Sequence, residues 1–299
     1  MSEKTIKGAL ISVYHKDGLG DIVNLLHEMN VKIYSTGGTY SFIKGSGIPV
    51  TAVEELTSYP SILGGRVKTL HPAVFGGILA RRENESDREQ AAKYAIPEID
   101  LVIVDLYPFE ETVRSTDDDD EIIEKIDIGG ISLIRAAAKN WSDVLVVSSR
   151  DQYPELLELL RKGRGVTTGD ERKRFAASAF GMSSHYDTLI FKYFSKGLDL
   201  PLLRESINSS YNLRYGENPH QKAVFYGDPS QVFEKLHGRE ISYNNLLDVD
   251  AALGLSREFR DPTLPLLSTI MHAVWQQGRT RLMHGPMPSP VIPFQPTGA

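Results

Sequence analysis

Residues 99–106 read IDLVIVDL, a nearly continuous apolar run with the length of one β-strand. Three similar runs occur at residues 8–13 (GALISV), 31–35 (VKIYS) and 143–148 (DVLVVS). Helical stretches separate them, such as residues 19–26, where apolar side chains recur near every 3.6 positions. Strands that are apolar on both faces and alternate with helices indicate a parallel sheet flanked by helices. We therefore expect an α/β fold.

Polar residues that follow these strands predict where a ligand binds, because parallel sheets bind ligands beyond the carboxyl ends of their strands. Asp17, after the first run, has the pattern of a cap for the helix that follows it. Residues 35–39, after the second run, open another helix. Glycines let the backbone approach an anion, while hydroxyl groups and helix N–H groups donate to it. The residues concerned are Ser35, Thr36, Gly37, Gly38 and Thr39, with Ser12 and Lys16 from the neighbouring loop. They predict a phosphate site, although a structural turn accounts for the glycines equally well.

Residues 61–82 have no clear period and contain two pairs of glycines. Within this segment Arg66 and Lys68 stand one residue apart. Two cations on a glycine-hinged loop suit an anionic substrate and can stabilise charge that develops during a reaction. A solvated basic loop is the alternative. His71 precedes Pro72, and we expect it either to orient the loop or to titrate.

The motif DIGG at residues 127–130 precedes a helical stretch ending near Asn140. Asp127 has the pattern of a helix N-cap, and the N–H groups behind it resemble an oxyanion site. Tyr107, in the string LYPF that follows the strand run at 99–106, can reach the same place. An ordinary cap and an ordinary buried aromatic side chain explain these two residues as well.

Composition excludes several classes of protein. The 299 residues contain 33 Lys and Arg against 39 Asp and Glu, a net charge of -6, which provides no footprint for nucleic acid or an anionic membrane. The absence of cysteine excludes disulfides, thiolate metal sites and a Cys nucleophile. The eight histidines lack metal-ligand spacing, and the acidic run 117–121 has the pattern of a solvated helix start, so we expect no metal. No apolar run spans a bilayer and no signal-peptide core is present, which predicts a cytoplasmic protein.

The last 36 residues differ from the rest of the chain. All acidic residues and all lysines precede Leu264, and only Arg279 and Arg281 carry charge beyond it. Five prolines between residues 286 and 296 disfavour regular structure. We therefore expect residues 264–299 to form a tail without regular structure.

Several long ordered strings carry a family resemblance. They are SVYHK (12–16), STGGT (35–39), LGGRVKTLHPAVFGGILA (63–80), LYPF (106–109), KIDIGG (125–130) and RAAAKN (135–140). Over residues 6–263 the chain resembles the bifunctional purine biosynthesis proteins that combine IMP cyclohydrolase with AICAR formyltransferase. The resemblance implies a methylglyoxal-synthase-like parallel sheet flanked by helices, followed by an incomplete α/β transformylase domain.

The resemblance also implies an activity and a set of roles. The amino-terminal domain would cyclise 5-formamidoimidazole-4-carboxamide ribotide to IMP with loss of water, without a metal or organic cofactor. Lys139 would donate or accept the proton, Lys68 and Tyr107 would stabilise developing charge, and Asp127 would orient the formamido group. The implied ribotide contacts are Ser12, Tyr14, His15, Lys16, Ser35, Thr36, Gly37, Gly38, Thr39, Arg66, Val67, Thr69, Val104, Asp105, Ile128, Gly129 and Gly130. Asp105 departs from the family, where many relatives have Asn.

A second domain begins with strings that match the family's transformylase. These are LRYGENPHQ (213–221) and SYNNLLD (242–248), in which Arg214 and Tyr215 would bind the ribotide. The co-substrate of that step is 10-formyltetrahydrofolate. The Lys-His pair expected after residue 263 does not occur, residues 264–299 match nothing in the family, and their composition fits a shifted reading frame. We therefore expect formyl transfer to be lost.

The predicted organisation has four parts: a cyclohydrolase domain at 1–196, a linker at 197–210, a truncated transformylase start at 211–263 and a tail at 264–299. The expected partner is a small purine ribotide, not nucleic acid or membrane. Relatives form homodimers, but the sequence does not predict the state of this chain. Two other classes stay open: a non-catalytic phosphate-sensing module of the same fold, and a methylglyoxal synthase-type lyase, for which no Asp/His pairing is evident around the phosphate site.

Overall fold

The structure, a computed structural model, describes residues 3–237, 239–256, 258, 266–268, 271–276 and 279–284. The chain divides into two compact units, Met1–Glu205 and Ser206–Ala299. The division falls inside the stretch 197–210 that the sequence predicts as a linker.

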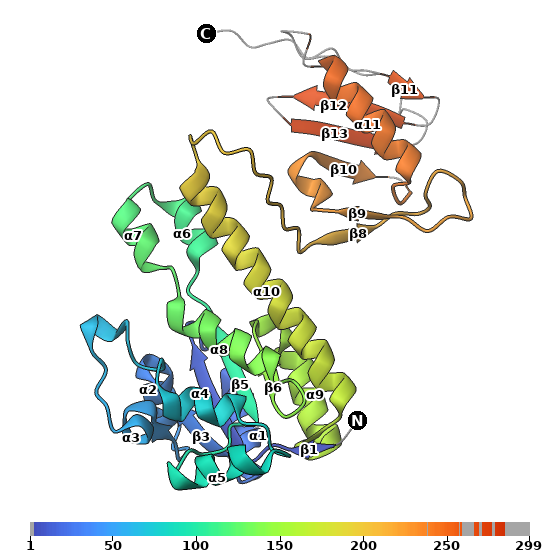
Figure 1. Cartoon of the computed structure of the whole chain (residues 1–299). Helices are drawn as coiled ribbons and strands as arrows, with labels where there is room; N and C mark the ends of the chain where they lie inside the picture. Colours follow the sequence, from blue (N-terminus) through green and yellow to red (C-terminus); the bar gives the residue numbers. More distant parts are fainter. Residues whose placement is uncertain are drawn as a thin grey trace. The chain divides into compact units, whose positions relative to one another are not determined.

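The first unit is built on a five-stranded parallel sheet (Figure 1). Its strand order is β4-β3-β2-β5-β6, with every neighbouring pair parallel. The strands are β2 (Gly8–Val13), β3 (Lys32–Ser35), β4 (Thr51–Ala52), β5 (Leu101–Asp105) and β6 (Leu145–Val147). After β2 the chain continues to β3 on one side of the sheet, and after β5 it continues to β6 on the other side. The adjacent strands β2 and β5 therefore form the topological switch point where such sheets bind ligands.

Helices cover both faces of this sheet, which confirms the α/β prediction. Successive residues of β2 point to opposite faces: Ala9 and Ile11 belong to one apolar cluster and Leu10 to the other. The first cluster contains side chains from α1 (Leu19–Glu28), α2 (Gly37–Gly45) and α9 (Tyr153–Gly163). The second contains side chains from α3 (Val53–Thr57), α4 (Pro72–Leu79), α6 (Phe109–Ser115), α7 (Asp119–Glu124), α8 (Ile128–Lys139) and α10 (Gly169–Ser195).

Smaller elements complete the unit. They are β1 (Lys4–Thr5) paired with β7 (Val166–Thr167), the helix α5 (Glu85–Lys93), and the 3₁₀ turns η1 (Leu63–Gly65) and η2 (Arg150–Gln152). One predicted cap is wrong: Gly18, with a left-handed backbone, precedes α1 and makes no side-chain cap, while Asp17 pairs with Arg150. The acidic run does begin a helix, because the Asp118 side chain accepts from N–H groups of α7.

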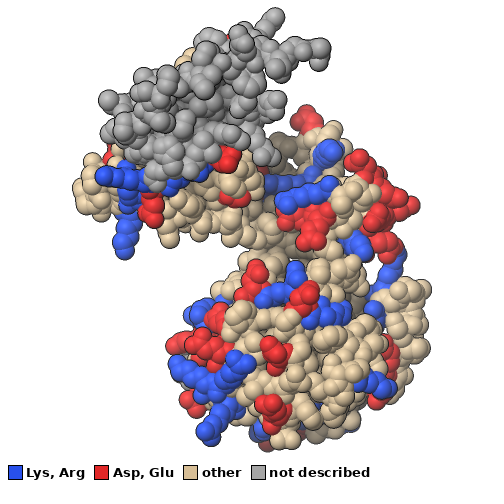
Figure 2. All heavy atoms as spheres, turned by 180° about the vertical axis from the view of Figure 1, so that it is seen from behind, with Lys and Arg blue, Asp and Glu red and all other residues tan. Residues whose placement is uncertain are grey.

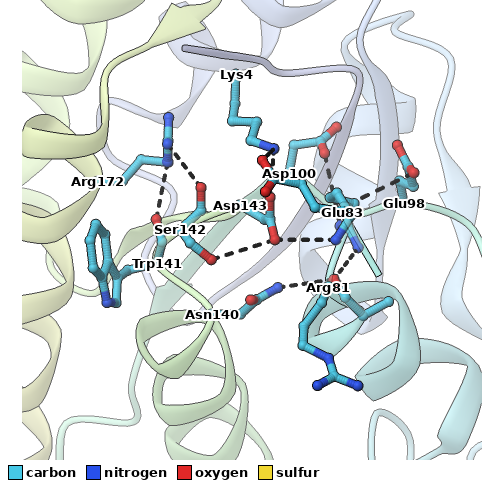
Figure 3. A network of polar contacts seen from close by, with 12 residues as sticks. Lys4, Arg81, Glu83, Glu98, Asp100, Asn140, Trp141, Ser142, Asp143 and Arg172 are labelled. Carbon is cyan, nitrogen blue, oxygen red and sulfur yellow. Dashed lines mark hydrogen bonds and ion pairs between the residues drawn. The ribbon is translucent and has the colours of Figure 1, made fainter. Parts of the chain in front are cut away.

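A polar network closes the amino ends of the strands (Figure 3). The Asp100 carboxylate accepts the backbone N–H groups of Lys7 and Gly8 at 2.8 and 3.0 Å. Lys4 pairs with Asp143 at 2.8 Å. The Arg172 guanidinium, on a residue 1% exposed, donates to the carbonyl oxygens of Trp141, Thr167 and Ser142 at 3.0, 2.7 and 2.8 Å. These contacts hold together the segments at the amino ends of the strands, opposite the carboxyl ends where such sheets bind ligands.

The second unit contains a two-stranded pair, β8 (Ser210–Asn212) with β9 (Val224–Tyr226), the turn η3 (Pro229–Gln231) and the helix α11 (Tyr243–Ser256). A separate sheet has the order β10-β13-β12-β11. Its strands are β10 (Phe233–His237), β11 (Leu266–Ser268), β12 (Met271–Gln276) and β13 (Arg279–His284).

The prediction of no regular structure in the tail is wrong for β11, β12 and β13. Strands β12 and β13 pair antiparallel and stand two residues apart in the sequence, the spacing of a tight hairpin. Apolar and aromatic residues such as Val274 and Trp275 favour extended backbone, and backbone pairing does not need the acidic residues that this segment lacks. The prolines at 286–296 lie outside the described residues.

On the face of the first unit that Figure 2 shows, charges of both signs are interspersed, and acidic side chains gather over α6 and α7. Among the residues that the structure describes, no helix combines the length and apolar character needed to cross a membrane.

Candidate functional site

Loops from β2 and β5 meet at the carboxyl edge of the sheet. The Asp105 carboxylate, at the end of β5, accepts the backbone N–H of His15 at 2.8 Å, and the same oxygen lies 2.8 Å from the His15 ring nitrogen Nδ1. The Asp105 carbonyl oxygen accepts the N–H of Tyr14 at 3.2 Å. Asp105 therefore clamps the loop that follows β2 onto β5, which gives the acid at this position a structural use.

The residues of the predicted phosphate site lie together at this edge, around the amino end of α2. Lys16 reaches it from the β2 loop: its ammonium donates to the carbonyl oxygens of Val13 and Tyr14, and a β-carbon built on Gly38 would lie 3.8 Å from its Nζ. Burial lowers the pKa of Lys16, with Asp105 opposing that shift. The Thr36 hydroxyl oxygen is buried and has no hydrogen-bond partner among the described residues. A buried unpaired hydroxyl is costly unless a ligand satisfies it.

Two predicted phosphate contacts use their hydroxyl groups inside the protein. The Ser35 hydroxyl donates to the carbonyl oxygen of Ile11 at 2.7 Å. The Thr39 hydroxyl donates to the carbonyl oxygen of Val13 and accepts its N–H, at 2.9 and 3.1 Å. Both side chains tie β2 to its neighbours, so their contribution to a ligand is to shape the turn.

The loop of residues 61–71 brings Lys68 to the same edge. A β-carbon built on Gly37 would lie 3.6 Å from the Lys68 ammonium, and one built on Gly65 would lie 3.3 Å from it. Both glycines have positive φ, +53° and +91°, which disfavours other residues. Arg66, from the same loop, forms an ion pair with Glu124.

His71 orients the loop, which is the first of the two roles predicted for it. Its ring nitrogen Nδ1 accepts the N–H of Ala73 at 3.2 Å, so His71 caps α4, with Pro72 at the first helical position. Thr69, near it in the loop, faces the other helix of the site: its hydroxyl oxygen lies 3.0 Å from a β-carbon built on Gly129. The loop therefore lies against the amino ends of both α2 and α8.

Asp127 is the N-cap of α8 and is half-buried. Its Oδ1 accepts the N–H of Gly130 at 2.6 Å, which confirms the predicted cap. Burial raises the pKa of Asp127, while the N–H groups of Gly130 and Tyr107 and the charge of Lys68 oppose that rise. A carboxyl group with a raised pKa is closer to exchanging its proton near neutral pH, a property typical of reactive sites.

Aromatic side chains complete the cluster. Tyr107 is 38% exposed, and burial followed by the Asp127 charge raises its pKa. Its ring meets that of Tyr14 edge to face at 5.5 Å, and the Lys125 ammonium lies 5.5 Å from the Tyr14 ring centroid. The predicted residues Ser12, Tyr14, Lys16, Lys68, Tyr107 and Asp127 thus occupy one edge of the sheet.

The structure separates Lys139 from this cluster and corrects its expected place beside Asp127. Lys139 is the last residue of α8, twelve residues after its cap, which corresponds to about 18 Å along the helix axis. The adjacent Asn140 donates to the carbonyl oxygens of Ile78 and Ala80 near the amino edge of the sheet. Helix α8 runs from the carboxyl ends of the strands to their amino ends, so its two ends cannot share a site within one chain.

Other predicted contacts are placed as follows. The Val104 side chain is 2% exposed and packs in the core, so only its backbone is available to a ligand. Ile128 is 57% exposed at the start of α8. Val67 closes the 61–71 loop through a bridge to Ile62. Arg214 and Tyr215 belong to the second unit, where the guanidinium carbon lies 4.7 Å from the Tyr215 ring centroid and the buried Nε has no partner among the described residues.

Sequence reasoning missed Tyr186, on α10. Its hydroxyl accepts the N–H of Asp127 at 2.7 Å and donates to the carbonyl oxygen of Lys125 at 2.9 Å. No local signal marks this residue, because its partners lie some sixty positions earlier in the chain. In the part of the chain that the structure describes, no group of three or more His, Asp or Glu could hold a metal ion.

Comparisons with known proteins agree with this architecture. The sequence profile of the MGS-like domain matches residues 18–132, and that of the AICARFT/IMPCHase bienzyme matches residues 137–274. The second match extends past Leu264, which corrects the expectation that nothing after residue 263 resembles the family.

Relatives described as bifunctional purine biosynthesis protein PurH share 58% identity in Bacteroides thetaiotaomicron, 46% in Listeria monocytogenes and 45% in Myxococcus xanthus. These alignments cover 89%, 86% and 88% of this chain, and 53%, 52% and 53% of the relatives. The chain thus spans about half the length of the curated relatives it matches. A solved structure titled "Crystal structure of ForH" is 35% identical with a TM-score of 0.56, and the match covers 64% of this chain and 100% of that one.

Proposed function

Because this chain belongs to the AICARFT/IMPCHase bienzyme family of purine biosynthesis, we propose that its first unit is an IMP cyclohydrolase. The proposed reaction closes 5-formamidoimidazole-4-carboxamide ribotide to IMP with loss of water. The observation that carries the proposal is the convergence of Lys68, Tyr107 and the half-buried Asp127 beside the turn to which we assign phosphate binding.

The reaction makes definite demands on the site. The carboxamide nitrogen must lose a proton as it bonds to the formamido carbon. The formamido oxygen then carries negative charge, takes up two protons in place of the two that the carboxamide and formamido nitrogens lose, and leaves as water when its bond to carbon breaks. Both reacting groups are part of one substrate, so the site has only to fix their mutual orientation.

We assign these tasks to the clustered side chains. The Asp127 carboxylate, opposite Lys68, accepts the carboxamide proton and orients the formamido group. The Lys68 ammonium and the Tyr107 hydroxyl donate to the developing oxyanion, and the raised pKa of Tyr107 keeps its proton in place. Lys16, the amino end of α2 and the unpaired Thr36 hydroxyl bind the ribotide phosphate. Within one chain Lys139 is too distant for a proton transfer here, so no step is assigned to it.

The second unit supports a narrower proposal. Arg214 and Tyr215 correspond to the ribotide contacts of the family's formyltransferase, whose co-substrate is 10-formyltetrahydrofolate. The sequence contains no Lys-His pair after residue 263. We propose that this chain does not transfer the formyl group, and formylated product in an assay with AICAR and 10-formyltetrahydrofolate would refute that.

The test of the cyclohydrolase uses the full chain and follows IMP formation spectrophotometrically. Lys68→Met should lower kcat by about 100-fold, because it removes a charged donor aimed at the oxyanion. Lys44→Met, on the exposed side of α2, is the matched control and should stay within twofold of the unchanged chain, since Lys44 contacts only Tyr40 among the described residues. Ribotide binding without turnover would refute catalysis and favour the phosphate-sensing alternative.

A further inference from the structure

The Tyr186 hydroxyl holds the turn that carries Asp127. It accepts the Asp127 N–H at 2.7 Å and donates to the Lys125 carbonyl oxygen at 2.9 Å, so one group fixes both sides of residue 126. Tyr186 is 5% exposed, and its ring meets Phe109 edge to face at 6.1 Å. Burial raises the pKa of Tyr186 to about 12, which keeps the donated proton in place.

This turn determines where two groups of the site point. Asp127 uses Oδ1 to cap α8, which leaves its carboxyl group oriented by the backbone that Tyr186 holds. Lys125 lies with its ammonium 5.5 Å from the Tyr14 ring centroid. The long helix α10 is a rigid base for the hydroxyl, because its Ala176 and Ala179 are buried in the same apolar cluster as α8.

We propose that Tyr186 is a positioning residue for the reaction, acting on Asp127 through backbone hydrogen bonds; this inference rests on the proposed cyclohydrolase function. Its removal misorients Asp127 without removing any group that contacts the ribotide. The expected signature is a loss in kcat with little change in KM, because ribotide affinity comes from the phosphate-binding turn on the other side of the site.

The variant Tyr186→Phe keeps the ring and deletes the two hydrogen bonds. Tyr193→Phe is a matched control: Tyr193 stands two turns later on α10, its ring also meets Phe109 edge to face at 5.9 Å, and its hydroxyl bonds to Asp119 outside the site. We expect Tyr186→Phe to lower kcat about tenfold with KM within threefold, and Tyr193→Phe to leave both within twofold.

Hydrogen exchange of the Asp127 amide provides a readout that does not depend on catalysis. In folded chain, confirmed by circular dichroism, Tyr186→Phe should accelerate this exchange at least tenfold relative to Tyr193→Phe, since the amide loses its acceptor. Unchanged exchange, or equal kinetic effects of the two variants, would overturn the positioning role. If the unchanged chain forms no IMP, the cyclohydrolase proposal fails, while the exchange rates still decide whether Tyr186 holds the turn.

Discussion

Replacement of Asp127 by Asn should separate activity from stability. The amide retains an oxygen that can accept the Gly130 N–H, and Asn caps helices as well as Asp, so α8 keeps its start. The variant loses the carboxylate that we assign to the carboxamide proton. We expect kcat to fall on the order of 100-fold, about 2.7 kcal/mol of barrier.

Stability should change in the opposite direction at neutral pH. Burial raises the pKa of Asp127 above its unfolded value, so the folded state binds this proton more tightly than the unfolded state. The unchanged chain therefore loses stability as pH rises through the folded pKa, because it must then hold a partly buried charge. Asn carries no charge, so the variant should be more stable at neutral pH, and the difference should vanish in acid, where Asp127 is protonated.

The assay is urea unfolding followed by circular dichroism at several values between about pH 4 and pH 8, with IMP formation measured in parallel. Asp118→Asn is the matched control, because Asp118 also caps a helix but is exposed and outside the site. We expect it to change kcat less than twofold and the unfolding free energy by less than about 0.5 kcal/mol. The reasoning is refuted if Asp127→Asn keeps a third of the activity, or if it destabilises the chain at neutral pH.

Two further predictions concern the edges of the sheet. Arg172→Met removes the buried guanidinium that donates to the carbonyl oxygens of Trp141, Thr167 and Ser142, and it should lower the unfolding free energy by about 3 kcal/mol. Arg174→Met, on the exposed side of the same helix, should cost no more than about 0.5 kcal/mol in the same urea titration. Equal losses would contradict the network. Asp105→Asn weakens the double contact to His15 and should raise KM about fivefold with kcat within twofold, because the loop carrying the phosphate contacts loosens; an unchanged KM would show that the clamp is dispensable.

Local sequence patterns predicted the parts of the fold that depend on local physics. Apolar runs placed four strands of the central sheet, β2, β3, β5 and β6. The two-residue strand β4 has no such run, because an edge strand of that length buries little. Composition does not predict the hairpin of β12 and β13, because pairing of the backbone does not depend on the acidic residues that this segment lacks.

The site shows the same division. Strand ends, glycine pairs and the cap at Asp127 were visible locally because backbone geometry restricts which residues fit there. The position of Lys139 cannot be predicted from local sequence, because the distance of a residue from a site depends on the direction in which its helix crosses the sheet.

The sequence by itself determined the parallel α/β sheet and predicted the strand ends at which the polar residues of the candidate site gather. Tertiary structure alone decided that Asp105 clamps the β2 loop, that Lys139 lies at the far end of α8, and that Tyr186 holds the turn of Asp127. The physical reason is range: propensity and capping act over a few residues, whereas these contacts join groups about 60 to 90 positions apart, or depend on the course of an entire helix.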